Sequence, residues 1–197
     1  MFGTNNVNYV RLESCDINRF DIHCYGRDVF CKGTVFRDLY NQFSSLYGHL
    51  TFTGCTFVKF VPVLFEDSYS AYTHFDLTFE DCKIIVDAKR PYLIHAGTPG
   101  VLAESPRAGM QQVSWPDVKL NNVTVVCPDN PKEWCLFTFS GDKTPVIHGM
   151  NNIEINNLIF SGSVQVPDVK LGNKKIITQQ PIAIKVTMSS IEDIKRE

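Results

Sequence analysis

The sequence predicts an all-β protein, a right-handed parallel β-helix of about six coils with a C-terminal β closing segment. Three observations support this prediction: a repeated apolar pattern, a turn-forming residue at a fixed place in each repeat, and a composition that favours strands. The chain has 197 residues, enough for one domain with a sizeable core, and 44% of them are hydrophobic. The many Phe, Val, Ile and Thr residues favour strands, and only 189–197 is compatible with a short helix.

The apolar pattern consists of two inward residues separated by one residue, a two-residue bend, and a second such pair. Alternation places the apolar side chains of each short strand on one face, and the bend joins two strands into a corner. Every inward position is apolar except Asp28 and Gly33. The six units begin at Val10, Asp28, Leu50, Leu77, Val118 and Ile153.

The second residue of each bend is, with one exception, of a type that tolerates a left-handed or turn backbone. These bend residues are Ser14, Lys32, Gly54, Asp81, Asn122 and Asn157, and Lys32 is the exception. A third apolar segment, such as Val61-x-Val63-x-Phe65 or Leu93-Ile94, follows most corners and gives three short strands per coil. An antiparallel sandwich also has short alternating strands, but it does not require the same bend in successive units. The parallel β-helix is therefore the preferred interpretation.

The coils are expected to occupy 1–161, with a loop inserted at about 97–117, where Pro, Gly and Ser interrupt the pattern. Residues 162–197 are expected to form a C-terminal capping segment. The first coil is expected to start near Val10, so that only a thin cap precedes it. Because an uncovered end of stacked strands aggregates readily, we expect a preceding domain of a longer protein or a virion partner there.

Charge and composition argue against several classes of protein. The formal net charge of -2 argues against nucleic-acid binding. No apolar run is long enough to span a bilayer, and the first residues lack the pattern of a signal peptide. No metal site or cofactor is predicted, because no CxxC pair and no phosphate-binding loop is present. Cys15, Cys55 and Cys82 share one inward position and are expected to be buried thiols rather than disulfide or metal ligands.

The outward positions of stacked coils form long faces that suit extended polysaccharides. Polar and aromatic residues cluster in 21–28, 66–69 and 87–95, and Trp115 adds an aromatic ring in the loop. A carboxylate pair there would suit glycosidic hydrolysis, a base with Lys or Arg would suit elimination, and an ordinary solvated surface is the alternative. The predicted carbohydrate-binding residues are His23, Tyr25, Arg27, Glu66, Tyr69, Arg90, Tyr92, His95 and Trp115. No catalytic residue is identified, and enzymatic activity stays open.

Four apolar residues are expected at outward strand positions, namely Val29, Leu64, Ile94 and Leu136. A contiguous apolar stripe on a surface normally marks a protein interface. The stripe predicts an oligomer, with a homotrimer of side-by-side coils as the expected form.

The corners Phe52-Thr-Gly-Cys55-Thr-Phe57 and Phe79-Glu-Asp-Cys82-Lys-Ile84 resemble coils of pectate-lyase-like β-helix proteins, as do Leu120-Asn-Asn-Val123 and Ile155-Asn-Asn-Leu158. Within that group the chain is most similar, over about 9–161, to bacteriophage tailspikes and related virion host-recognition proteins. The resemblance implies a virion homotrimer, assembled in the host cytoplasm, that binds or cleaves bacterial surface polysaccharide. Since no acid pair is identifiable, polysaccharide binding is the expected function. A polysaccharide lyase or glycoside hydrolase and a purely structural virion component are the alternatives.

Overall fold

The described part of the chain is all-β. The computed structural model describes residues 2–4, 7–18, 20–22, 26–37, 40–43, 46–58, 61–65, 74–86, 91–96, 116–139, 146–147, 149–178 and 181–187. Within these ranges the regular structure consists of strands alone. Every strand pairing in them is parallel. This is the arrangement that the repeat predicts, and it excludes the antiparallel sandwich for the described strands.

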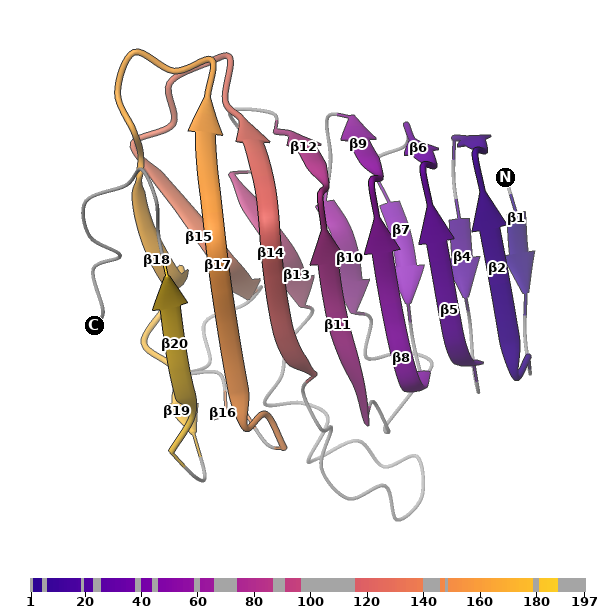
Figure 1. Cartoon of the computed structure of the whole chain (residues 1–197). Coiled ribbons are helices and arrows are strands. Elements are labelled where there is room, and N and C mark those ends of the chain that lie inside the picture. Colours follow the sequence, from indigo (N-terminus) through magenta and orange to yellow (C-terminus); the bar gives the residue numbers. More distant parts are fainter. Residues whose placement is uncertain are drawn as a thin grey trace.

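Most of the strands belong to one large parallel sheet that turns a corner (Figure 1). Its long arm contains β2 (Tyr9–Glu13), β5 (Gly26–Lys32), β8 (Leu46–Thr53), β11 (His74–Glu80), β14 (Asp117–Val126), β17 (Asn152–Ser161) and β20 (Ala183–Thr187). Its short arm contains β3 (Asp16–Ile17), β6 (Val35–Phe36), β9 (Thr56–Val58) and β12 (Lys83–Ile85). Because β14 runs through the corner, it pairs with β11 in one arm and with β12 in the other.

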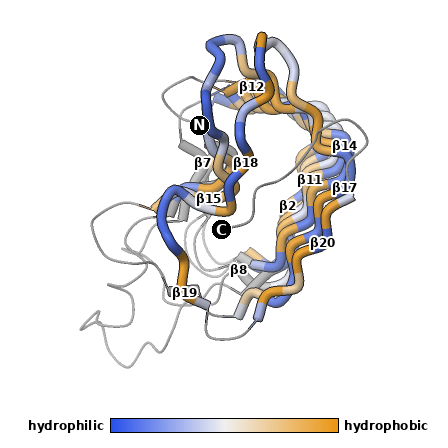
Figure 2. Tube along the Cα trace, turned by 90° about the vertical axis from the view of Figure 1, so that its left-hand side faces the viewer, coloured by the Kyte–Doolittle hydropathy of each residue, from blue (hydrophilic) through white to orange (hydrophobic). Residues whose placement is uncertain are grey.

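A second parallel sheet lies across from the long arm. It contains β1 (Phe2–Thr4), β4 (Phe20–Ile22), β7 (Tyr40–Phe43), β10 (Val61–Phe65), β13 (Tyr92–Ala96), β15 (Glu133–Phe139) and β18 (Asp168–Gly172). A small separate pair joins β16 (Val146–Ile147) to β19 (Ile177–Thr178). Seen from the side, the long arm and the strands β15 and β18 face each other across a common interior, and the sheets curl into a half-barrel (Figure 2).

The corners are made by residues in the left-handed backbone region. Ser14, Gly54, Asp81, Asn122 and Asn157 have φ values of 51°, 60°, 51°, 54° and 57°, which confirms five of the six predicted bend residues. Asn and Asp tolerate this conformation because their short polar side chains bond locally, and Gly has no Cβ to clash. The bends set the point where the strand direction changes in each repeat unit.

The bend predicted at Lys32 was wrong by one residue, and so was the register of the unit predicted to begin at Asp28. Gly33, not Lys32, has the positive φ of 57°. Val29 and Cys31 are buried and pair with Leu50 and Phe52 of β8, whereas Asp28 and Phe30 lie on the other face. Gly adopts the left-handed backbone without strain, and the shift replaces Asp28 with an apolar inward residue.

Aromatic rings fill the interior at the corner. Phe52 and Phe79, predicted to be neighbours in the core, are fully buried and stacked with ring centroids 5.0 Å apart. Phe57 meets Phe52 edge-on at 5.1 Å, and Phe36 stacks on Phe57 at 5.0 Å. Stacked and edge-on ring pairs of this kind add to the stabilisation from apolar burial.

The six cysteines that the structure describes are buried or half-buried: of the three predicted to be buried thiols, Cys55 and Cys82 are buried and Cys15 is half-buried. Cys15, Cys31, Cys55, Cys82, Cys127 and Cys135 are all free. The Lys83 N–H donates to the Cys55 carbonyl over 2.9 Å, so Cys55 and Cys82, which directly precede β9 and β12, lie in adjacent bends. Buried Thr34 stands between Cys15 and Cys55. Burial raises the pKa of Cys31, which keeps this thiol neutral.

The expected outward apolar stripe was wrong for three of its four members. Val29, Ile94 and Leu136 are 0%, 0% and 2% exposed. Val29 points inward because of the register shift. Ile94 and Leu136 lie on strands where consecutive residues are buried, as in parallel strands covered on both faces. The side chain of Leu64 lies outside the described residues.

The two ends of the chain contribute strands to the same sheets. β1 pairs with β4, so strand structure starts at Phe2 and not near Val10 as expected. β18 and β20 pair with β15 and β17, which extends both sheets into the expected capping segment. The loop expected at about 97–117 lies outside the described residues as far as 115, whereas Pro116 is described and Asp117 already begins β14. The short helix expected at 189–197 lies outside the described residues.

Candidate functional site

The outward-pointing side chains of the long arm form three straight rows across its strands, here called the outward face. In-register parallel pairing repeats each position from strand to strand at about 4.8 Å. The first row contains Tyr9, Asp28, His49, Asp76, Asp117, Asn152 and Ala183. The second contains Arg11, Phe30, Thr51, Thr78, Lys119, Glu154 and Lys185. The third contains Glu13, Lys32, Thr53, Glu80, Asn121, Asn156 and Thr187.

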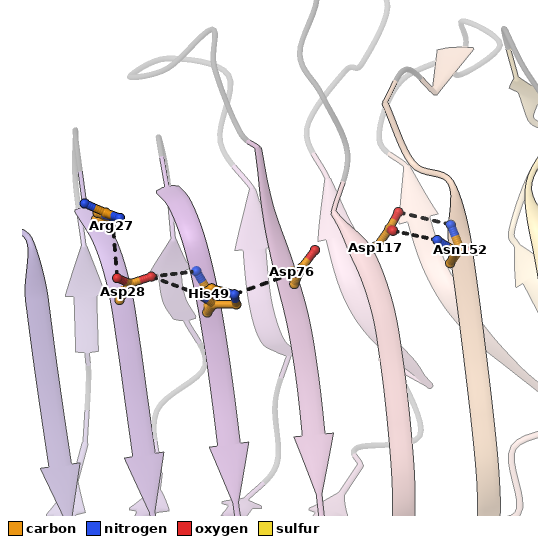
Figure 3. A network of polar contacts seen from close by, with 6 residues as sticks. All are labelled: Arg27, Asp28, His49, Asp76, Asp117 and Asn152. Atoms are coloured by element: carbon orange, nitrogen blue, oxygen red, sulfur yellow. Dashed lines mark hydrogen bonds and ion pairs between the residues drawn. The ribbon is translucent and has the colours of Figure 1, made fainter.

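Two carboxylates of the first row accept hydrogen bonds from the backbone of the following strand (Figure 3). Asp28 Oδ1 accepts hydrogen bonds from the His49 N–H and lies near His49 Nδ1, both over 3.1 Å. Asp117 Oδ1 accepts from the backbone N–H groups of Asn151 and Asn152 over 2.6 and 3.0 Å, and its Oδ2 accepts from Asn152 Nδ2 over 2.9 Å. Both side chains therefore have a structural role.

Gly48 makes the Asp28 contact possible. Its φ is +103°, and a Cβ at this position would lie only 2.3 Å from Asp28 Oδ1. A glycine thus leaves the room in which the carboxylate approaches the backbone of His49. Arg27 Nε lies 3.5 Å from Asp28 Oδ2 and balances part of its charge.

Asp76 differs from these two carboxylates in its surroundings. Its side chain is 63% exposed, and its Oδ2 lies 3.8 Å from His49 Nε2. It is the in-register neighbour of Asp117, so two carboxylates stand side by side on adjacent strands. Asp117 is held by N–H donors, whereas Asp76 faces solvent.

A hollow of about 450 Å³ opens on the outward face over β11, β14, β17 and β20. Its polar lining consists of Asp76, Thr78, Asp117, Lys119, Asn152, Glu154 and Lys185. A hydrogen bond from Asn156, together with the charges of Lys119 and Lys185, holds the pKa of Glu154 below its usual range. The hollow therefore offers anionic acceptors, cationic donors and an amide within a small area.

A second hollow of about 250 Å³ opens at the other end of the outward face, over β2, β5 and β8. It is lined by Tyr9, Arg11, Glu13, Phe30, Cys31, Lys32, Thr51 and Thr53. The two hollows share the same rows, because both are built on the long arm of the large sheet.

The residues predicted from the sequence to bind carbohydrate fall in three places. Arg27 lies on β5, beside Asp28 at the edge of the outward face. Tyr92 and His95 lie on β13 of the second sheet, with ring centroids 5.6 Å apart, and His95 Nδ1 is 3.0 Å from Thr138 Oγ1. The structure therefore does not bring Arg27 together with the other two. His23, Tyr25, Glu66, Tyr69, Arg90 and Trp115 lie outside the described residues.

The sequence did contain a signal for the first row that the prediction missed. His49, Asp76, Asp117 and Asn152 each stand directly before the first inward residue of a repeat unit. Asp28 has the same place once the register of its unit is corrected. A polar residue at one fixed position of every unit marks a row on one face of stacked strands.

The fold and the outward face together define a class of protein: an all-β chain of stacked parallel strands with rows of mostly polar side chains on one face. No protein-family model matches the chain, nor does any curated protein or solved structure. In the part of the chain that the structure describes, no group of three His, Cys, Asp or Glu side chains is arranged to hold a metal ion. The same residues include no helix with the length and apolar character needed to cross a bilayer.

Proposed function

We propose that this chain is a right-handed parallel β-helix that binds an extended polysaccharide along the outward face. The observation that supports the proposal is the registry of three mostly polar rows over seven strands. A linear polymer has a repeating shape, and a surface with a repeat of about 4.8 Å presents equivalent groups along its length. The polymer runs across the strands, parallel to the rows.

The chemistry of the larger hollow suits sugar hydroxyl groups, which both donate and accept hydrogen bonds. Asp76, Asp117 and Glu154 accept, Lys119 and Lys185 donate, and Asn152 does both. The charges are mixed, so that recognition depends on directed hydrogen bonds rather than on a field of one sign.

From the resemblance of its corners to tailspike coils, we further propose that the ligand belongs to the bacterial surface and that the protein belongs to a virion. It also favours a homotrimer, although the apolar stripe that suggested an interface is largely buried. Light scattering tests the assembly: a particle of three times 22.3 kDa supports the homotrimer, and a particle of 22.3 kDa contradicts it.

A glycan array of bacterial capsules and lipopolysaccharides tests the binding function. Wild-type protein is expected to bind at least one polysaccharide, and Asp76→Ala and Lys119→Ala are expected to weaken binding about tenfold each, as loss of a hydrogen bond to a charged group does. Lys83→Ala is the matched control, because Lys83 is exposed on β12, in the short arm of the sheet. A wild-type protein that binds no glycan contradicts the proposal and favours a structural virion component.

Hydrolysis of the bound polysaccharide is the second candidate function, and the pairing of Asp76 with Asp117 favours it. Neighbouring carboxylates in different surroundings are suited to separate acid and base roles. Appearance of reducing ends, lost in both Asp76→Asn and Asp117→Asn, would support a hydrolase. Unsaturated sugars would indicate a lyase instead, and the absence of any product would leave binding alone.

A further inference from the structure

Two aromatic side chains stand on the outward face, away from the core. Tyr9 of β2 is 56% exposed, and Phe30 of β5 is half-buried beside it. Their ring centroids are 5.5 Å apart and their planes are tilted by 39°. Single exposed apolar residues are common on proteins, but a pair in contact at the floor of a hollow is a more specific feature.

The rim of this hollow supplies polar groups. Arg11 forms an ion pair with Glu13, and the hydrogen bond and charge of Glu13 raise the pKa of the Arg11 guanidinium group, with a smaller contribution from Tyr9. Thr51 and Thr53 line the opposite side of the hollow, and each hydroxyl can donate and accept a hydrogen bond.

We propose that Tyr9 and Phe30 form a platform for one pyranose ring of the polysaccharide. The platform lies at the end of the outward face opposite the larger hollow. This inference rests on the proposed function. A pyranose has one face of C–H groups, which packs on an aromatic ring, and a rim of hydroxyl groups. The platform offers the matching surfaces: aromatic carbon on its floor, and hydroxyl and charged groups around it.

The rows lead from this platform to the larger hollow without a change of sheet. Tyr9 and Asp76 both belong to the first row, and three strand spacings separate β2 from β11. That separation is about 14 Å, so a glycan that occupies both places has several sugar units. The ligand class is therefore an extended oligosaccharide or polysaccharide, and a monosaccharide or disaccharide fills only one place.

The affinities of oligosaccharides of increasing length distinguish binding at this platform from binding at the rest of the outward face. The probe is an oligosaccharide ladder, from disaccharide to octasaccharide, made by partial hydrolysis of the polysaccharide that wild-type protein binds on the array. Titration calorimetry is expected to show that wild-type affinity rises with length. Tyr9→Ala is expected to lose about tenfold in affinity for the long members, which reach the platform, and nothing for a disaccharide that occupies the larger hollow. Tyr9→Phe keeps the ring and stays within about twofold of wild type.

The results that would contradict the platform can be told apart from those that would contradict the proposed function. If Tyr9→Ala binds the whole ladder like wild type while Asp76→Ala loses binding, the platform is wrong and the glycan function stands. If wild type binds no glycan on the array, both are wrong. If a random peptide library binds at Tyr9 and no glycan does, the hollow is a peptide site. Equal melting temperatures of wild type and Tyr9→Ala exclude an effect through folding.

Discussion

Phe52 and Phe79 lie stacked on neighbouring parallel strands, with ring planes 25° apart and both side chains fully buried. The repeat in the sequence placed these two residues at the same position of successive units, and their backbones are in-register partners. Their contact shows that the spacing of apolar residues, and not only their number, determines which side chains meet in the core.

Phe79→Ala is expected to lower the free energy of unfolding by about 3–5 kcal/mol, because it removes a fully buried ring and leaves a cavity. Thr78→Ala, one residue earlier on the outward face, is the matched control and is expected to change it by less than about 0.5 kcal/mol. Urea denaturation measures both. A loss below about 1 kcal/mol for Phe79→Ala would contradict the register.

Gly48→Ala is expected to destabilise the protein by about 2–4 kcal/mol, because the new methyl group displaces the Asp28 carboxylate and strains the backbone. Gly54→Ala is the control: its φ is +60°, but nothing lies within 4 Å of the added Cβ, and only the backbone cost of about 1–2 kcal/mol applies. Thermal denaturation of the two variants compares them. Equal costs would mean that the Asp28 contact contributes nothing, and Asp28→Ala should reduce the cost of Gly48→Ala.

Asn122 is the middle of a ladder of side-chain hydrogen bonds along the corner. Its Nδ2 donates to Asp81 Oδ1 over 2.6 Å, and its Oδ1 accepts from Asn157 Nδ2 over 2.8 Å. Asn122→Ala loses the ladder and strains the backbone, whereas Asn122→Gly loses the ladder alone. Denaturation is expected to show Asn122→Gly about 1 kcal/mol more stable than Asn122→Ala and less stable than wild type. A glycine variant as stable as wild type would show that the ladder does not stabilise the corner.

Alkaline pH is expected to destabilise the fold through its buried thiols. Burial raises the pKa of Cys127 to about 11 from the ordinary 9.0, so the folded state keeps this proton longer than the unfolded state. The stability from the neutral thiol is fully present below about pH 9 and is lost as pH rises towards about 11. Cys127→Ala should flatten the fall in unfolding free energy over this range. Identical pH profiles for the two proteins would contradict the assignment.

The corners and the stacking direction could be predicted from the sequence because each depends on local features: an alternating apolar pair, and a bend residue that accepts positive φ. The prediction failed where the local signal was ambiguous. At Lys32-Gly33 two bend positions were possible, and choosing the first placed Asp28 inward and Val29 outward. The burial of Ile94 and Leu136 could not be read from alternation, since their strands are covered on both faces.

The outward face was harder to predict, because it depends on which residues of distant segments become neighbours. Asp76 and Asp117 are separated by a long insertion in the chain, yet they are in-register partners. The predicted site residues were chosen where polar residues cluster along the sequence, in segments such as 87–95. Stacked strands instead gather residues that are one repeat apart, so a polar residue in the same place of each unit was the better signal.

The rows, the hollows and the proposed glycan site all depend on in-register parallel stacking, and an engineered cross-link tests that stacking most directly. Thr51 and Thr78 are in-register partners on the outward face, about 4.8 Å apart at Cα, within the range that a disulfide spans. Thr51→Cys with Thr78→Cys is expected to oxidise to an intramolecular disulfide, identified by mass spectrometry of non-reduced peptides.

The control pair is Thr51→Cys with Lys119→Cys, which lies two strand spacings apart, about 9.6 Å, and is too distant for a disulfide. The stacked arrangement predicts a cross-link in the first pair and none in the control under the same oxidising conditions. A control that cross-links as well as the neighbouring pair, or a neighbouring pair that stays reduced, would contradict the parallel register from which the whole account is built.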